Sequence, residues 1–132
     1  MRLDVFFSPA ELSAGEINGR TVVVIDVLRA GTTIVEALAA GARAIYPAAS
    51  TEEAIRIATN LGRSEVVLCG ERKCLPIEGF DLGNSPREFT PERVSGKTLV
   101  MTTTNGTRAI LASLEAERVY VAAFANLGAT AE

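Results

Sequence analysis

Short apolar runs rich in β-branched residues alternate along this chain with segments of helical periodicity. This alternation is typical of α/β folds, in which helical crossovers connect parallel strands. We therefore expect an α/β fold: a three-layer arrangement with a mainly parallel β-sheet flanked by helices. The expected strands are 3–7, 21–25, 44–47, 65–69, 98–102 and 118–122. The expected helices are 32–40, 51–61 and 105–114, with a short helical turn near Pro91.

Two patterns indicate which side chains are buried. The strands at 21–25 and 98–102 are apolar without strict alternation, which predicts burial on both faces of the sheet. Ser50 and Glu53 form a capping box that starts one helix, and Gly62 ends it. The helix residues expected to face the core are Ile34, Leu38, Ala54, Ile55, Ala58, Leu61, Ile110 and Leu114.

The composition of the chain argues against several classes of function. The 132 residues are enough for a single α/β domain, 1–132, and a net charge of −3 indicates no nucleic-acid partner. No apolar run approaches the roughly 20 residues needed to span a bilayer, so we expect no membrane partner. Two cysteines, Cys69 and Cys74, favour free thiols and a cytoplasmic location. The absence of histidine excludes histidine phosphatases, Ser-His-Asp hydrolases and His-ligated zinc sites.

The last residues resemble the start of a helix. Asn126 has the character of an N-cap, and only six residues follow it, too few for a stable helix in water. We therefore expect the N-terminal part of a longer chain. The apolar strand 119–121 would then need a continuation or a partner chain to cover it, which favours a homo-oligomer.

The first loop that could bind a ligand or take part in catalysis is 26–33. Asp26 follows a strand, and Thr32 and Thr33 lie at a helix start, where free N–H groups attract anions. Arg29 could bind a phosphate or carboxylate through its planar guanidinium group. The alternative is structural: Thr32 as a plain N-cap and Asp26 paired with Arg29. Haloacid dehalogenases place a second Asp two residues after the first, where this chain has Leu28.

The second loop is long and rich in charge and glycine, 69–86. Glu71 and Asp81 offer hard oxygen ligands suited to Mg²⁺. The alternative is a solvated surface loop.

The third loop, 101–107, is a strand-to-helix turn dense in hydroxyl groups. Its N–H groups could hold phosphate oxygens, although the P-loop spacing is absent. The alternative is threonines acting as strand formers, followed by a cap.

Because ligands bind beyond the carboxyl ends of strands in open parallel sheets, we expect the three loops to share one site. Asp26, Glu71 and the turn 102–107 should then converge at one edge of the sheet.

Four segments, 26–33, 70–72, 79–86 and 102–107, closely resemble in order and spacing the 2-phosphosulfolactate phosphatase family. The resemblance covers nearly the whole chain. It implies Mg²⁺-dependent hydrolysis of 2-phospho-3-sulfolactate to sulfolactate and phosphate, a step towards coenzyme M in methanogens, or hydrolysis of a related 2-phospho acid. Two departures are Gly31, where Thr or Ser is expected, and Lys73-Cys74, where the family pattern is more glycine-like. Family chains are also considerably longer.

The leading hypothesis is thus a phosphoric monoester hydrolase with a small anionic phosphorylated substrate. Asp26, Glu71 and Asp81 would hold Mg²⁺ or orient the attacking water, and Arg29 completes the catalytic set. The substrate-binding residues would be Arg72, Thr32, Thr33, Asn84, Ser85, Thr103, Thr104, Asn105, Gly106 and Thr107. The alternatives are a non-catalytic binding domain for a phosphorylated or sulfonated metabolite, and an inactive fragment.

Overall fold

The computed structural model describes all 132 residues, and its strands form two sheets. The larger sheet has the order β2-β5-β3-β4, and the smaller one pairs β1 with β6. Every pairing is parallel except the short β3–β4 hairpin. The strands are β1 Thr21–Ile25, β2 Ala44–Pro47, β3 Val66–Arg72, β4 Leu75–Pro76, β5 Thr98–Thr102 and β6 Arg118–Ala122.

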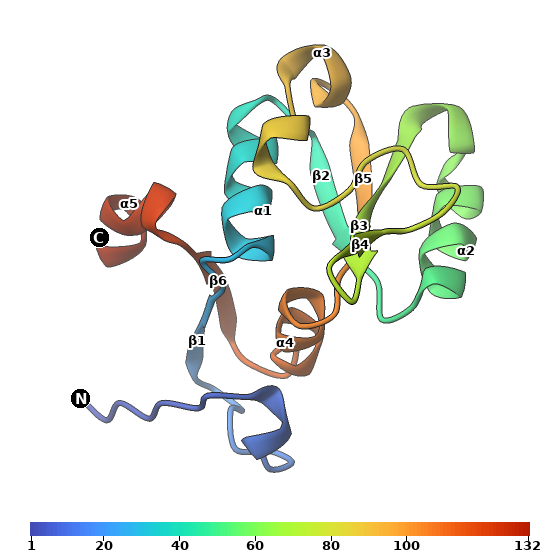
Figure 1. Cartoon of the computed structure of the whole chain (residues 1–132). Coiled ribbons are helices and arrows are strands. Elements are labelled where there is room, and N and C mark those ends of the chain that lie inside the picture. Colours follow the sequence, from blue (N-terminus) through green and yellow to red (C-terminus); the bar gives the residue numbers. More distant parts are fainter.

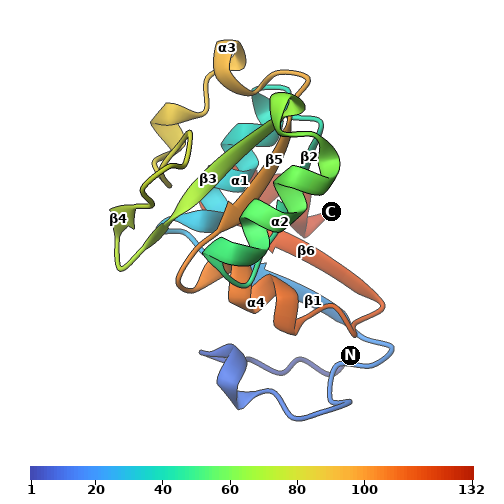
Figure 2. The same ribbon diagram turned by 90° about the vertical axis from the view of Figure 1, so that its right-hand side faces the viewer.

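Helices cover both faces of the larger sheet, which confirms the expected three-layer α/β arrangement (Figure 2). The α-helices are α1 Ala30–Ala39, α2 Thr51–Leu61, α3 Pro91–Val94, α4 Gly106–Ala112 and α5 Leu127–Ala131. Single turns of 3₁₀ helix occur at Pro9–Glu11, Arg63–Glu65, Pro86–Glu88 and Phe124–Asn126. None of the helices is both long enough and apolar enough to cross a membrane.

The core lies on the two faces of β3 and β5. On one face Ala54 and Ala58 of α2 pack against Val66, Leu68 and Val100. The other face carries the larger cluster, whose members include Ile34, Ala37, Val67, Cys69, Leu99 and Met101. β5 is buried along its whole length, as its sequence predicts. The even and odd residues of β3 therefore point to opposite helix layers, and this alternation also separates the side chains at its carboxyl end.

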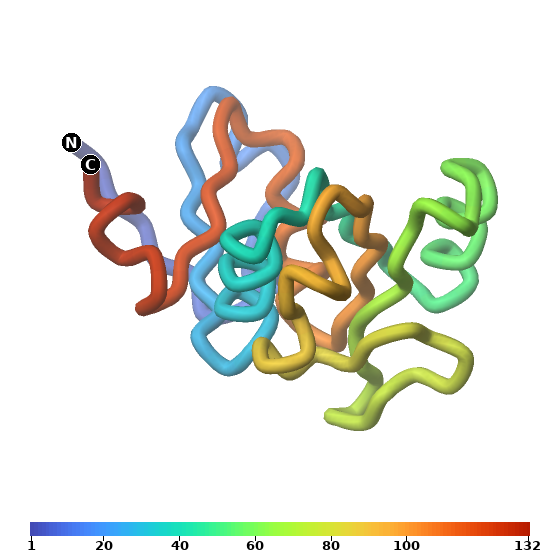
Figure 3. Tube along the Cα trace, turned by 90° about the horizontal axis from the view of Figure 1, so that it is seen from above, coloured from blue at the N-terminus to red at the C-terminus, as the bar shows by residue number.

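The β1–β6 pair lies on the far side of α1 from the larger sheet (Figures 1 and 3). The prediction that 21–25 is buried on both faces is therefore wrong: Val23 is 43% exposed and Ile25 is 72% exposed. A strand in a two-stranded sheet has only one neighbour, and helices cover only part of it.

Several other sequence predictions are also wrong. Residues 3–7 form no strand, and Leu3, Val5 and Phe7 are exposed because no strand pairs with this segment. The helix residues Leu38, Ile55, Leu61 and Leu114, expected to face the core, are exposed as well. The Ser50 N-cap is confirmed, since its hydroxyl accepts a hydrogen bond from the Glu53 N–H at 3.1 Å, and Gly62 ends α2 with a positive φ of 91°. The reciprocal bond of the capping box does not form, because the Glu53 carboxylate accepts from the Ala49 N–H at 2.7 Å and not from that of Ser50.

Candidate active site

Glu71 is a buried carboxylate held by three hydrogen bonds. It lies near the carboxyl end of β3 and is only 7% exposed. Its oxygens accept hydrogen bonds from the Thr104 N–H at 2.6 Å, the Thr104 hydroxyl at 3.0 Å and the Cys74 N–H at 2.8 Å. Burial alone would raise the pKa of Glu71, but the hydrogen bonds from Thr104 and Cys74 outweigh it and lower that pKa. The side chain therefore stays ionised.

Asp26 follows β1 and lies beside the start of α4. A Cβ atom built on Gly106 would be 2.5 Å from Asp26 Oδ2 and 2.5 Å from Ala30 Cβ, so the first residues of α1 and α4 meet at this carboxylate. Burial raises the pKa of Asp26, the Ala30 N–H opposes the rise, and the charge of Glu71 adds to it. Asp26, Glu71 and the turn 102–107 thus converge, as their positions in the sequence predict.

The convergence joins two sheets and not one edge of a single sheet. Asp26 follows β1 of the smaller sheet, whereas Glu71 and Thr104 come from the ends of β3 and β5 in the larger one. The junction is crowded with backbone. A Cβ atom on Gly31 would be 2.2 Å from the Asp26 carbonyl oxygen and 3.1 Å from that of Ala122. Gly31, where Thr or Ser was expected, is therefore required by this packing.

The hydroxyl groups of the turn serve mainly to build it. The Thr107 hydroxyl accepts a bond from the Thr103 N–H at 2.9 Å, and the Thr107 N–H donates to the Thr103 hydroxyl at 3.0 Å. Both threonines are buried. The N–H and the hydroxyl group of Thr104 both donate to the Glu71 carboxylate. Only Asn105 is exposed, at the N-cap of α4, and its side chain makes no capping bond. The structural interpretation thus holds for Thr103 and Thr107.

The Lys73-Cys74 pair forms the two-residue turn between β3 and β4. Both residues have positive φ, 51° and 66°, in a hairpin where Arg72 pairs with Leu75. Two positive φ angles in a two-residue hairpin loop indicate a type I′ turn, which favours glycine and asparagine. This geometry explains why a more glycine-like pair is expected here. Sequence reasoning missed the role of Cys74, because its contribution is a backbone N–H bonded to Glu71.

The first loop departs from its structural interpretation. No ion pair joins Asp26 to Arg29, which is itself the N-cap residue of α1 without a side-chain capping bond. Thr32 lies inside α1, and its hydroxyl donates to the Val27 carbonyl at 2.7 Å. Thr33 is buried, and its hydroxyl donates to the Asn84 carbonyl at 3.2 Å. The Arg29 guanidinium group therefore forms no ion pair and no capping bond at the start of α1.

Arg72 points to the opposite face of the sheet from Glu71. Its guanidinium group donates to the Thr102 hydroxyl and, at 2.9 Å, to the Glu71 carbonyl. Asn84 is 6% exposed, and its Oδ1 is buried without a hydrogen-bond partner. Ser85 precedes the turn Pro86–Glu88, and its side chain makes no capping bond there. Asn84 thus offers an unused polar atom next to α1, through its contact with Thr33.

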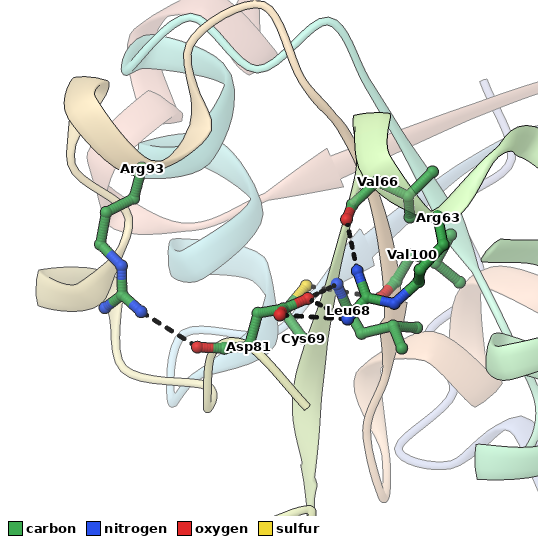
Figure 4. A network of polar contacts seen from close by, with 7 residues as sticks. All are labelled: Arg63, Val66, Leu68, Cys69, Asp81, Arg93 and Val100. Carbon is green, nitrogen blue, oxygen red and sulfur yellow. Dashed lines mark hydrogen bonds and ion pairs between the residues drawn. The ribbon is translucent and has the colours of Figure 1, made fainter. Parts of the chain in front are cut away.

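The structure does not bring Asp81 together with Asp26 and Glu71. Its carboxylate forms an ion pair with Arg63 at 2.9 Å and accepts a bond from the Leu68 N–H at 2.8 Å, as Figure 4 shows. No group of three or more Cys, Asp or Glu side chains that could hold a metal forms in the structure. Asp81 is kept away from Glu71 because it lies beside Leu68, in the middle of β3, where the Arg63 guanidinium group neutralises its charge.

Comparison with known proteins agrees with the resemblance. A model of the family described as 2-phosphosulpholactate phosphatase matches residues 6–132. The chain is 44% identical over 126 residues to a probable 2-phosphosulfolactate phosphatase of Clostridium beijerinckii, covering 96% of this chain and 53% of that relative. A protein of the same name from Symbiobacterium thermophilum is 50% identical over 113 residues, covering 86% and 48%. The relative from Clostridium tetani is 44% identical over 132 residues, covering 100% and 56%.

The chain thus spans about half the length of the curated relatives it matches. The family match nevertheless extends over almost every residue, including all the loops that build the carboxylate site. On these grounds the chain belongs to the 2-phosphosulpholactate phosphatase family.

Proposed function

We propose that this chain takes part in Mg²⁺-dependent hydrolysis of a phosphomonoester, 2-phospho-3-sulfolactate or a related 2-phospho acid, with release of phosphate. The observation that carries the proposal is the convergence of Asp26 and Glu71 on the turn 102–107, where Asp26 lies against Gly106 and Glu71 is bonded to Thr104. These residues are 45 positions apart in the sequence and belong to different sheets. The names of the relatives support the reaction and the substrate class.

The residues present fit a hard divalent cation in part. Asp26 and Glu71 are carboxylates, the ligand type that Mg²⁺ prefers, and the one hydrogen bond to the Asp26 carboxylate that affects its pKa comes from the Ala30 N–H. Asp26 and Glu71 would hold the ion, with Asp81 excluded by its pairing with Arg63. Bound there, Mg²⁺ would neutralise charge on the phosphoryl group during transfer.

The chain's own groups would bind and orient the substrate. The free guanidinium group of Arg29 and the unpaired N–H groups at the start of α1 suit the oxygens of a phosphate or a carboxylate. Because the chain has no histidine, a carboxylate must serve where other hydrolases use an imidazole, and we assign to Asp26 either the binding of the ion or the orientation of the attacking water.

An assay of phosphate release from 2-phospho acids, with and without Mg²⁺, tests the proposal. Asp26→Asn should reduce turnover by about 100-fold or more, because an amide keeps the shape but lacks the charge. Asp81→Asn is the matched control and should leave turnover within about twofold, since that carboxylate lies outside the cluster. Mn²⁺ binding, followed by electron paramagnetic resonance, should weaken in the first variant only. Unchanged turnover in Asp26→Asn would disprove the assignment.

A binding domain without hydrolysis is the second candidate, and one observation favours it. Only two of the three expected carboxylates come together, and anion binding needs neither. Calorimetric binding of a 2-phospho acid without Mg²⁺, together with no phosphate release in its presence, would support this alternative.

Self-association and a cytoplasmic location belong to the same proposal. The exposed apolar side chains Val23, Ile25 and Tyr120 on β1 and β6 support a homo-oligomer, which light scattering would detect. Both cysteines are free, and Cys74 is exposed, which suits a reducing compartment.

A further inference from the structure

A second polar site lies at the amino end of β3, away from Asp26 and Glu71. A cavity of about 370 Å³ opens there, within the size range of small-molecule sites. Its polar lining consists of Arg63, Ser64, Asp81, Arg93 and Lys97, with the first residues of β3 at its base. Val67 precedes Glu71 by four residues, a separation of about 13 Å along a strand. The two sites are therefore distinct.

The two arginines of this cavity are held in place by one residue. Arg63 donates to both carboxylate oxygens of Asp81, at 3.1 and 2.9 Å, and to the Val66 carbonyl at 2.8 Å. Arg93 donates to the backbone carbonyl of Asp81 at 3.0 Å. Figure 4 shows the two guanidinium groups on either side of Asp81. Each keeps further N–H groups for a ligand, and less side-chain entropy is lost when a ligand binds to donors that are already ordered.

The charge of the cavity is positive although the chain is acidic overall. Three cationic side chains line it against the single carboxylate of Asp81, which leaves two positive charges in a chain of net charge −3. Lys97 forms no ion pair, and the Ser64 hydroxyl makes no hydrogen bond. A concave surface with a net positive charge concentrates anions.

We propose that this cavity binds a small phosphorylated metabolite carrying at least two negative charges. Arg93, Lys97 and Ser64 contact the phosphate, and Arg63, whose charge is compensated by Asp81, contributes its remaining N–H groups. The site does not depend on the proposed function, because none of its residues belongs to the carboxylate cluster.

Titration of the ¹⁵N-labelled chain with inorganic pyrophosphate, in metal-free buffer at low salt, tests the proposal. Amide shifts should appear at Ser64, Val67, Leu82 and Lys97, and the same shifts should persist in Asp26→Asn. Arg93→Ala combined with Lys97→Ala should weaken binding at these amides by about tenfold or more, because two charge-assisted contacts are lost.

The matched control combines Arg87→Ala with Arg118→Ala, which removes the same charge from exposed positions outside the cavity. Its affinity should stay within about twofold of the parent chain. Equal losses in the two double variants would mean non-specific attraction and would overturn the proposal. It would also fail if no shifts occurred at the cavity, or if they were confined to residues 29–33 and 103–107. In that last case the proposed function would remain standing.

Discussion

The acidic residues along β3 and the loop after it are held in opposite ways. At the carboxyl end, Glu71 is bound by backbone N–H groups and a hydroxyl, none of which carries a formal charge. Nearer the amino end, Asp81 accepts one backbone N–H, that of Leu68, and is also bound by the charged guanidinium group of Arg63. The first carboxylate keeps its negative charge available to a cation, whereas the second is neutralised. Two acids that look equivalent in the sequence therefore differ in chemistry because of their donors.

The two ends also differ in packing. The carboxyl end is built by backbone in close approach around Asp26, where Gly31 and Gly106 leave no room for a side chain. The amino end opens into a cavity. Substitutions should therefore have their largest effects at the carboxyl end, and the four variants below run from the largest expected effect to the smallest.

The largest effect is expected for Gly31→Ala. The new Cβ would lie 2.2 Å from the Asp26 carbonyl oxygen, and a backbone atom cannot move aside cheaply. We expect a loss of about 3 kcal/mol in the free energy of unfolding, although alanine is the better helix former. Urea denaturation measures it. Gly128→Ala in α5, where nothing lies within 4 Å, is the control and should be neutral or slightly stabilising. A neutral Gly31→Ala would show that the junction is loosely packed.

An intermediate effect is expected for Glu71→Gln. An amide nitrogen would face N–H or hydroxyl donors, so at least one buried group would lose its partner, at a cost of about 2 kcal/mol at pH 7. The pKa of Glu71 is lowered, so its stabilisation is present above the ordinary value of 4.5 and is lost as the pH falls through its folded value. The difference from the parent chain should therefore shrink in acid.

Asp81→Asn sharpens this comparison. The Asp81 and Arg63 side chains are 40% and 49% exposed, and ion pairs of that exposure contribute about 0.5 kcal/mol. Denaturation curves of the two variants at pH 7 should thus differ by more than 1 kcal/mol. Equal losses would mean that backbone donors and an arginine hold these acids equally well.

The smallest effect is expected for the stability of Asp26→Asn, and it has the opposite sign. Because the pKa of Asp26 is raised, mainly by burial, the folded state binds the proton more tightly than the unfolded state. The ionised side chain therefore destabilises the fold at pH 7, and this cost disappears below the ordinary value of 3.8. Because solvent screens a half-buried carboxylate, asparagine should add less than about 0.5 kcal/mol at pH 7 and nothing near pH 3. Thermal unfolding at both values measures it, and destabilisation at pH 7 would contradict a strained carboxylate.

Part of this molecule follows from the sequence alone. Strands 21–25, 44–47, 98–102 and 118–122 have the expected bounds, because continuous apolar runs between polar residues define where a strand starts and stops. Ser50 starts α2 through a hydrogen bond to a residue three positions away. The proximity of Asp26, Glu71 and the turn 102–107 could be predicted from the sequence, because the carboxyl ends of the strands in α/β folds lie close together.

Only the tertiary structure decided which partners those side chains meet. The sequence contains no signal that β1 and β6 pair apart from the other strands, since pairing depends on contacts between residues about 97 positions apart. Nor does it show that Asp81 meets Arg63, 18 residues earlier, or that the Cys74 N–H turns towards Glu71. Local patterns reflect the periodicity of a single segment. Whether a carboxylate meets a metal, an arginine or a backbone donor depends on segments that are distant in the chain. The packing of those segments cannot be predicted from a local pattern.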